Sequence, residues 1–240
     1  MAKGFTQVIG EDYEETYASV ARLESVRLLC AIAASRQLRL WQVDFVSAFL
    51  NSDSSFEVFM EQPKGFEEGE GDYVWKLQKT LYGTMQGSHD WAENLDKTFE
   101  EHGYYKSHAD PQIQSKVHDD ELTITSTWTD DILGASSTVE GERLAKFQLG
   151  SSYEIKDLGK AKFILGMRID RNAQGDITLS QQAYCEHLLK RFNMNSCLQA
   201  TTPFPPGTVL SIEDCPTTPD QENKIKNTPF REALGSLMWL

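Results

Sequence analysis

Residues 122–134 read LTITSTWTDDILG, and two adjacent acids, Asp130 and Asp131, fall there between two strand-like pieces. A carboxylate buried without a partner costs roughly several kcal/mol. Neighbouring like charges also raise each other's pKa unless a cation neutralises them. A turn aspartate that bonds its own backbone is the ordinary explanation of a single acid in such a place, but it accounts less well for a pair. The pair is therefore a candidate cation site, with turn-forming aspartates as the competing interpretation.

A third acid interrupts another apolar run. Residues 40–46 read LWQVDFV, with Asp44 inside the run. Because Asp44 and Asp130 are 86 residues apart, only the fold can bring them together. If their strands are neighbours, the carboxylates form an oxygen-rich site of the kind that binds Mg²⁺ (or Mn²⁺) together with substrate phosphates. Phosphoryl transfer needs little beyond such positioning and charge neutralisation. A strand-end acid that faces water is the alternative.

Apolar spacing predicts both helices and strands along the rest of the chain. Helices are expected from Leu23, across Trp91 to Phe99, from a capping box at Ser137 to Gly150, and after an N-cap at Ser180. Strands are expected at residues 38–46, 56–60, 73–77, 113–117, 122–128, 163–169 and 177–179. Six of the eight prolines lie beyond residue 200, which predicts a linker there without packed helix or sheet.

Composition narrows the class of protein. The chain has 240 residues, enough for a buried core, and no apolar run long enough to span a membrane. It has four cysteines without zinc-ligand spacing, and it begins without a leader-like apolar stretch, so we expect an intracellular protein with no membrane partner. Glycine-rich phosphate loops are absent from the sequence. The net charge of −13 opposes binding to a phosphate backbone, although many of the acids are confined to residues 57–72.

A set of short motifs follows one order along nearly the whole chain. They are Ala2–Gln7, Asp12–Thr16, Val20–Arg27, Asp44 with Ala48–Asn51, Met60–Phe66, Leu81–Gly83, Gln86, Ala109–Pro111, Asp130–Leu133, Lys156–Gly159, Phe163–Gly166, Leu179–Gln181 and Gly235–Leu237. Each motif alone is weak, but the ordered set is highly specific. In this order the chain resembles the reverse transcriptase of copia-type long-terminal-repeat retrotransposons.

The resemblance implies an α+β fold, the palm of a right-hand polymerase with an antiparallel sheet and packed helices. Residues 1–176 would form partial fingers and the palm, and residues 177–200 the start of the thumb. Residues 201–240 would be a proline-rich connection toward an RNase H domain that the chain lacks. The implied activity is RNA-directed DNA polymerisation by two-metal nucleotidyl transfer to a primer 3′-hydroxyl, incomplete in this fragment.

The resemblance also implies roles for individual residues. Asp44, Asp130 and Asp131 would hold the metals, and Lys156 would protonate pyrophosphate. Phe45 would offer its backbone carbonyl to the nucleotide, Gln86 would lie near the nucleotide, and Phe49 would be the steric gate that excludes a 2′-hydroxyl. The primer contacts would be Trp128, Thr129, Phe163, Leu165 and Gly166.

Partners and location follow from the same resemblance. We expect an RNA or DNA template with its primer, deoxynucleoside triphosphates, and the integrase and RNase H domains of a polyprotein, in cytoplasmic virus-like particles or the nucleus. The sequence departs from the family where Trp128-Thr129 replaces Tyr-Val, Met85 replaces Lys and His89 replaces Arg. Two alternatives stay open. One is a decayed or domesticated palm-fold remnant that acts as a non-catalytic binding module, and the other is another palm-type metal enzyme such as a nucleotidyl cyclase.

Overall fold

A computed structural model describes residues 2–69, 73–202, 204–205 and 207–240. The expectations that involve Glu70, Asp72, Pro203 and Pro206 lie outside the described residues. The chain forms two compact units. Residues 1–164 and 169–178 make the first, and residues 165–168 and 179–240 make the second. The assignment of palm, fingers and thumb to particular ranges stays a prediction.

An antiparallel sheet of six strands is the framework of the first unit, with the order β4-β5-β6-β7-β1-β8. Every neighbouring pair in it is antiparallel. The strands are β1 (Arg39–Phe45), β4 (Tyr105–Lys106), β5 (Ile113–His118), β6 (Glu121–Trp128), β7 (Asp131–Ser136) and β8 (Ile155–Lys160). The α+β class with an antiparallel sheet is confirmed. β8 was not expected from the sequence.

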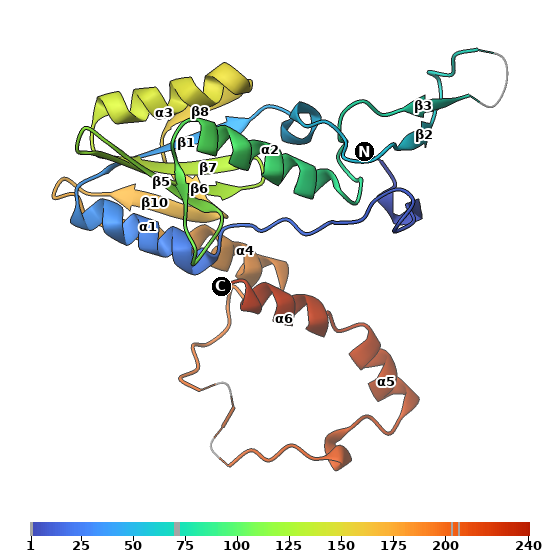
Figure 1. The fold of residues 1–240 in the computed structure, drawn as a ribbon. Helices are drawn as coiled ribbons and strands as arrows, with labels where there is room; N and C mark the ends of the chain where they lie inside the picture. The colour runs from blue at the N-terminus through green and yellow to red at the C-terminus, as the bar shows by residue number, and fades with distance from the viewer. Residues whose placement is uncertain (1, 70–72, 203, 206) are drawn as a thin grey trace. The chain divides into compact units, whose positions relative to one another are not determined.

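Helices cover both faces of this sheet. The helix α3 (Val139–Ser152) lies on one face and α1 (Leu23–Ser35) on the other (Figure 1). The helix α2 (Gly87–Glu101) shares a core cluster with α3. Alternate residues of β1 enter a core cluster with side chains of α2 and α3, because successive side chains of a strand point to opposite faces. The cluster contains Trp41, Val43, Phe45, Trp91, Leu95, Phe99, Ala145 and Leu149.

A close contact between β1 and β7 depends on a residue without a side chain. The indole ring of Trp41 is fully buried against Gly134, and a Cβ at that glycine would lie 2.1 Å from two ring atoms. The Trp41 indole N–H donates to Ser136 Oγ at 2.9 Å, which fixes the orientation of the ring. Tryptophan can therefore fill this part of the core only because position 134 leaves room for it.

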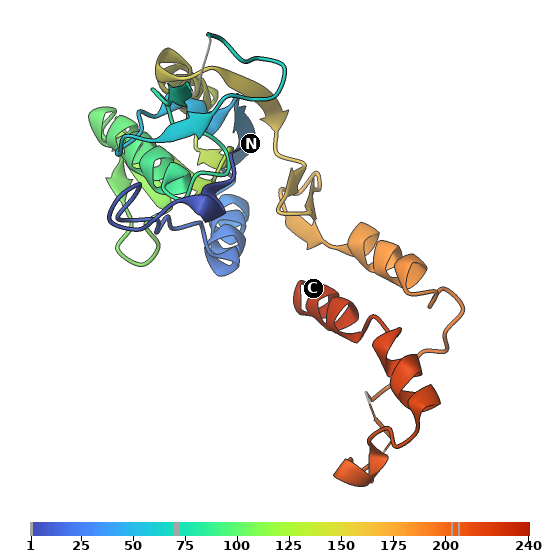
Figure 2. The same ribbon diagram turned by 90° about the vertical axis from the view of Figure 1, so that its right-hand side faces the viewer.

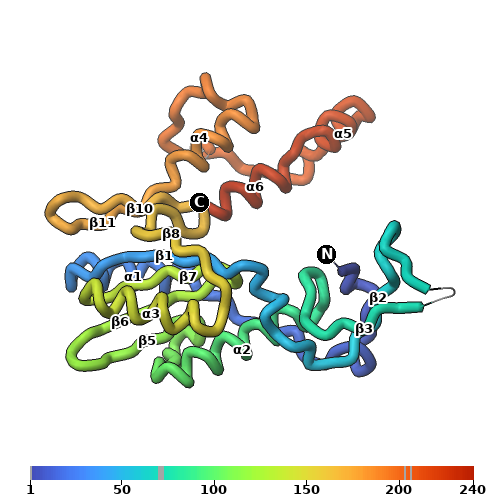
Figure 3. The backbone as a smooth tube through the Cα atoms, turned by 90° about the horizontal axis from the view of Figure 1, so that it is seen from above, coloured from blue at the N-terminus to red at the C-terminus, as the bar shows by residue number. Residues whose placement is uncertain are grey.

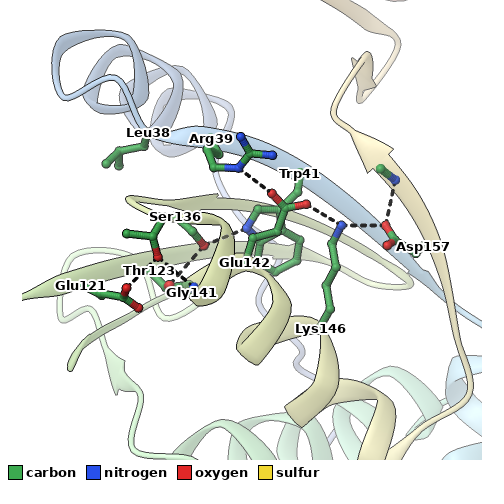
Figure 4. Close-up of polar contacts among 12 residues, drawn as sticks. Leu38, Arg39, Trp41, Glu121, Thr123, Ser136, Gly141, Glu142, Lys146 and Asp157 are labelled. Atoms are coloured by element: carbon green, nitrogen blue, oxygen red, sulfur yellow. Dashed lines mark hydrogen bonds and ion pairs between the residues drawn. The ribbon is translucent and has the colours of Figure 1, made fainter. Parts of the chain in front are cut away.

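Ion pairs join α3 to the strands β1 and β8 (Figure 4). Glu142 accepts from Arg39 of β1 at 3.0 Å and from Lys146 at 2.8 Å. Lys146 also reaches Asp157 of β8 at 2.8 Å, and its Nζ lies 5.6 Å from the centre of the Trp41 ring. Lys146 and Glu142 are largely shielded from solvent, whereas their strand partners Asp157 and Arg39 are partly exposed, so each link from α3 to a strand contributes modestly.

Short strands and turns make up other parts of the chain, and the residues of some of them are divided between the two units. The strands β2 (Phe59–Glu61) and β3 (Val74–Lys76) form a hairpin that extends away from the large sheet (Figure 3). Short 3-10 turns lie at Gly4–Thr6 and Ala48–Asn51. The expected strand across residues 163–169 is wrong as one piece. It is broken into β9 (Phe163–Ile164) and β10 (Met167–Arg171), because Leu165 and Gly166 turn with positive φ. A further strand, β11 (Ile177–Ser180), pairs with β10.

Two helices begin one residue later than the sequence predicted. The expected capping box at Ser137 is displaced, because Thr138 is the N-cap of α3 and its hydroxyl accepts from the N–H of Gly141. The next helix, α4 (Gln182–Arg191), has Gln181 rather than Ser180 as its N-cap. In both places a neighbouring polar residue competes for the cap position, and spacing alone does not separate the two.

The second unit contains helices where a linker was expected. The 3-10 turn Ile212–Asp214 is followed by α5 (Pro219–Lys226) and α6 (Phe230–Met238). The sequence predicted no packed helix or sheet beyond residue 200; two helices form there, and neither has a buried residue among those described. Pro219 stands in the first turn of α5, where a missing N–H costs nothing. The helices α4 and α6 lie side by side (Figure 2), joined by an ion pair between Arg191 and Glu232. No helix in the described residues has the length and apolarity needed to cross a membrane.

The contact between Gly134 and Trp41 gives a test of the packing. We expect Gly134→Ala to lower the free energy of unfolding by about 1–3 kcal/mol or more, because the new methyl group overlaps the buried indole. The measurement is urea unfolding monitored by tryptophan fluorescence.

The matched control is Gly150→Ala in α3. Its Cβ would meet only the tip of Ile155, at 3.6 Å, so alanine should leave stability unchanged or raise it by up to about 1 kcal/mol. Equal stability of the two variants would contradict this account of the core.

Candidate active site

The register of β1 and β7 brings the distant acids together. Asp44 is the strand partner of Asp131, and the backbone N–H of Phe45 donates to the carbonyl of Asp130 at 2.8 Å. Partners in an antiparallel pair lie about 4.5–5.5 Å apart at Cα, with their side chains on the same face. Asp44 and Asp131 therefore share one face of the sheet, and Asp130 lies at the turn beside them.

Burial and mutual repulsion both act on these acids. The pKa of Asp130 is raised, first by partial burial and then by the charge of Asp44, while a hydrogen bond from Tyr82 opposes the rise. The pKa of Asp131 is also raised, by partial burial and by the charges of Asp44 and Asp130, and a hydrogen bond from Gln42 opposes it. The arrangement therefore disfavours the ionised carboxylates unless a positive charge compensates them.

The two oxygens of Asp130 have different surroundings. Oδ2 accepts a hydrogen bond from the Tyr82 hydroxyl at 3.0 Å. Oδ1 is buried and has no hydrogen-bond partner among the described residues. A buried acceptor without a partner is rare in folded proteins and calls for a specific explanation. A cation or a substrate group that approaches Oδ1 would supply one.

A strained turn presents Asp130. Because Trp128 pairs with Asp131, the loop between β6 and β7 contains only Thr129 and Asp130. Thr129 has a φ of 48°, which a β-branched residue adopts only at a cost. Its carbonyl accepts from the indole N–H of Trp91 at 2.9 Å. The core helix α2 thus holds the backbone next to the acids.

The expected nucleotide contacts lie at different depths. Phe49 is in the turn after β1, and its ring stacks on Tyr82 with centroids 4.4 Å apart and an interplanar angle of 18°. Phe45 is buried edge-on against Trp91 at 5.0 Å. Gln86 is buried at the start of α2. The side-chain amide of Gln7 donates to Gln86 Oε1 at 3.1 Å, and Gln86 Nε2 donates to Ser54 Oγ at 3.4 Å. The side chain of Gln86 is thus occupied by protein partners.

The remaining expected residues lie on β8 and on the β9–β10 turn. Lys156 is exposed and is the strand partner of Asp44 on the side away from Asp131, so it projects from the same face as the acids. Phe163 is exposed at the start of β9. Leu165 and Gly166 belong to the second compact unit, whereas the acids belong to the first.

The acidic side chains at this site do not form a complete coordination sphere for a metal ion. Within the described part of the chain, no group of three or more His, Cys, Asp or Glu side chains is arranged to hold a metal ion. Mg²⁺ commonly uses only one or two carboxylates and takes its other oxygens from water and phosphate. The carboxylates of Asp44 and Asp130, with the buried and unpaired Oδ1 of Asp130, fit that partial role.

Two supporting side chains and one backbone feature of this site were not identified from the sequence. Tyr82, which was noted only as part of a motif, reaches Asp130, and Trp91, which was assigned only to the core, bonds to Thr129. The positive φ of Thr129 has no sequence signal, because threonine is not a typical turn residue.

Comparisons of the sequence with known proteins find a family and several relatives. The model of the family described as reverse transcriptase (RNA-dependent DNA polymerase) matches residues 1–206. The chain is 36% identical over its whole length to the retrovirus-related Pol polyprotein from transposon TNT 1-94 of Nicotiana tabacum. It is 31% and 29% identical to those from transposons RE1 and RE2 of Arabidopsis thaliana, again over its whole length. The chain covers 18% of the first relative and 16% of the other two.

The partial burial of Asp131 and the repulsion from its acidic neighbours predict a stability that depends on pH. Because the folded pKa of Asp131 is raised, the folded state binds more protons than the unfolded state just above the ordinary carboxyl range of about 4. The contribution of Asp131 to stability is therefore greatest below that range and falls as pH rises through its raised pKa. We expect Asp131→Asn to be more stable than the wild type at pH 7, by up to about 1 kcal/mol for a half-exposed group, and equal to it at low pH.

The measurement is urea unfolding at pH 7 and at pH 3.5 or the lowest pH at which both proteins fold. Asp120→Asn is the control, since Asp120 lies in the exposed β5–β6 turn. A wild type as stable as Asp131→Asn at neutral pH would argue against repulsion among the acids.

Proposed function

This chain belongs to the reverse transcriptase (RNA-dependent DNA polymerase) family, and we propose that it joins deoxynucleotides to the 3′-hydroxyl of a primer by metal-dependent nucleotidyl transfer. The observation that carries this proposal is the convergence of Asp44, Asp130 and Asp131 at one end of β1 and β7. The raised pKa values of Asp130 and Asp131 and the unpaired oxygen of Asp130 favour a cation at this place.

In the proposed mechanism Asp44 and Asp130 hold Mg²⁺ or Mn²⁺, and Asp131 supports them by its charge. Such ions, when bound, neutralise phosphate charge and favour ionisation of the attacking hydroxyl. The protein itself contributes fixed positions: the Thr129 carbonyl is held by Trp91, and the Asp130 carboxylate by Tyr82. Because these groups are held in place before the reaction begins, little entropy is lost on reaching the transition state, and this accounts for much of the barrier reduction in phosphoryl transfer.

Lys156 is the proposed proton donor to the departing pyrophosphate. Its place opposite Asp44 on β8 supports this role, because an exposed ammonium group projects there from the face that carries the acids. Backbone pairing with β1 sets the position of β8, and Lys146 of α3 adds an ion pair to Asp157. Lys156 thus meets phosphate from a fixed strand while its side chain stays flexible.

Phe49 is the proposed sugar gate. A ring held by stacking excludes a 2′-hydroxyl by volume alone, and the Phe49 ring is held against Tyr82. The Phe45 carbonyl and Gln86 are the other proposed nucleotide contacts, and Gln86 would exchange its bonds with Gln7 and Ser54 for bonds to the nucleotide. The proposed primer contacts are Trp128, Thr129, Phe163, Leu165 and Gly166.

The wider context is proposed from the relatives, which are Pol polyproteins of transposons. The chain would form the palm with partial fingers and the start of the thumb, and would act beside integrase and RNase H domains on an RNA or DNA template. Virus-like particles in the cytoplasm, or the nucleus, would be its place of action.

A non-catalytic binding role is the second candidate. The net charge of −13 supports it, because an acidic surface repels a template. The replacement of two expected basic residues by Met85 and His89 acts in the same direction, and His89 bonds the carbonyl of Tyr17 rather than facing a phosphate. Primer extension distinguishes the two candidates, since a binding module extends nothing.

The first functional prediction concerns Asp130. In the Pol polyprotein that carries this chain, Asp130→Asn should lower primer extension with Mg²⁺ by about 10³-fold, because it removes a charged oxygen where charge develops. The matched control is Asp120→Asn, in a second Asp-Asp pair in the β5–β6 turn, where asparagine suits the positive φ. Extension by Asp130→Asn at the rate of Asp120→Asn would refute the metal-binding role.

The second functional prediction concerns Phe49. We expect Phe49→Val to increase incorporation of ribonucleotides relative to deoxynucleotides by about tenfold to a hundredfold, as a smaller side chain admits the 2′-hydroxyl. The measurement compares kcat/KM for the two nucleotides on the same primer and template. Phe99→Val, in the core away from the acids, controls for general loosening, and an unchanged ratio in Phe49→Val would remove Phe49 from the gate.

A further inference from the structure

One side chain touches both a proposed metal ligand and the proposed sugar gate. The Tyr82 hydroxyl donates to Asp130 Oδ2 at 3.0 Å, and the Tyr82 ring stacks on Phe49 at 4.4 Å. The two contacts use different parts of the tyrosine, since the hydroxyl serves the carboxylate and the ring face serves the phenylalanine. They can therefore be separated by substitution.

The loop that carries Tyr82 is fixed from several directions. The backbone carbonyl of Tyr82 accepts from the N–H of Ala2 at 2.7 Å, and the carbonyl of Gly83 accepts from the N–H of Gly4 at 2.9 Å. A Cβ at Gly4 would lie 2.1 Å from the Gly83 carbonyl oxygen, so this approach requires glycine. The Thr80 N–H donates to Ser52 at 2.9 Å, and the Thr80 hydroxyl donates to the carbonyl of Phe49. Tyr82 is thus anchored to the same turn that carries Phe49.

The contact with Asp130 sets the direction of its carboxylate. Oδ2 is occupied by the phenol, whereas Oδ1 is buried without a hydrogen-bond partner among the described residues. A neutral donor on one oxygen stabilises the anion without filling the position that a cation would take. The carboxylate could otherwise rotate about its last bond, because terminal torsions of this kind are broad.

We propose that Tyr82 is a positioning residue that orients the Asp130 carboxylate toward a divalent cation and holds the Phe49 ring against its own. The inference rests on the proposed polymerase function and adds to it a link between metal binding and sugar selection. Tyr82 contacts both Asp130 at the β6–β7 turn and the ring of Phe49 after β1, and so connects two residues that are 81 positions apart in the sequence.

The test compares Tyr82→Phe with Tyr82→Ala. Binding of Mn²⁺ alone to the 240-residue chain is followed by the electron paramagnetic resonance of free Mn²⁺, and kcat, KM and the ribonucleotide-to-deoxynucleotide ratio are measured in the polyprotein. Tyr82→Phe keeps the stacked ring, so it should lower Mn²⁺ affinity and kcat by about tenfold to a hundredfold, the effect of one hydrogen bond to a charged group. The nucleotide ratio should not change.

Tyr82→Ala should show the same losses and, in addition, about tenfold more ribonucleotide incorporation, because Phe49 loses its support. Tyr104→Phe is the control. It also removes a phenol hydroxyl from the core cluster, but from a ring that packs on Phe99, and it should change neither metal affinity nor the nucleotide ratio.

Three outcomes decide the matter. Wild-type Mn²⁺ affinity and kcat in Tyr82→Phe would overturn the role at Asp130, and equal nucleotide ratios in Tyr82→Phe and Tyr82→Ala would overturn the role at Phe49. In both cases a wild type that binds Mn²⁺ and extends primers leaves the proposed function intact. A wild type that does neither would overturn the proposed function, and this inference with it.

Discussion

The repulsion among three carboxylates at one end of a β-strand pair is the constraint on which the account of this chain depends. Hydrogen bonding between β1 and β7 sets Asp44 opposite Asp131, and the two-residue turn adds Asp130 beside them. The same backbone bonds that stabilise the sheet therefore force like charges together. Proteins tolerate such local conflicts mainly at functional sites, where a ligand resolves them. Because the site offers only oxygen donors, the ligand that suits it is a divalent cation such as Mg²⁺ that also binds phosphate oxygens.

The rest of the fold keeps this arrangement in place. Gly134 admits the Trp41 indole and so allows β1 and β7 to approach over a tightly packed core. The indole of Trp91 holds the strained Thr129, and Lys146 of α3 adds an ion pair to β8. Tyr82 connects the turn after β1 to the acids. Each of these contacts joins segments far apart in the sequence, so the site exists only in the folded unit.

Local patterns in the sequence predicted most of the elements but not how they meet. The apolar runs around Asp44 and Asp130 were recognisable as strands, and the stripe of Trp91, Leu95 and Phe99 as a helix, because period and burial agree there. The pairing of β1 with β7 had no local signal and followed only from the resemblance. The proline-rich tail was misjudged because proline at a first helical turn, as at Pro219, is compatible with helix. The hydrogen bond from Tyr82 was beyond sequence reasoning, since the side-chain direction of a loop residue depends on tertiary anchors.

Titration of the aspartate carboxyl carbons by nuclear magnetic resonance, with and without Mg²⁺, tests the central claim most directly. The account predicts that the carboxyls of Asp130 and Asp131 titrate above the ordinary range in the free protein, and that Mg²⁺ returns both to lower pH. If both carboxyls titrate in the ordinary range and Mg²⁺ leaves them unchanged, the acids neither repel one another nor share a cation, and the account is contradicted.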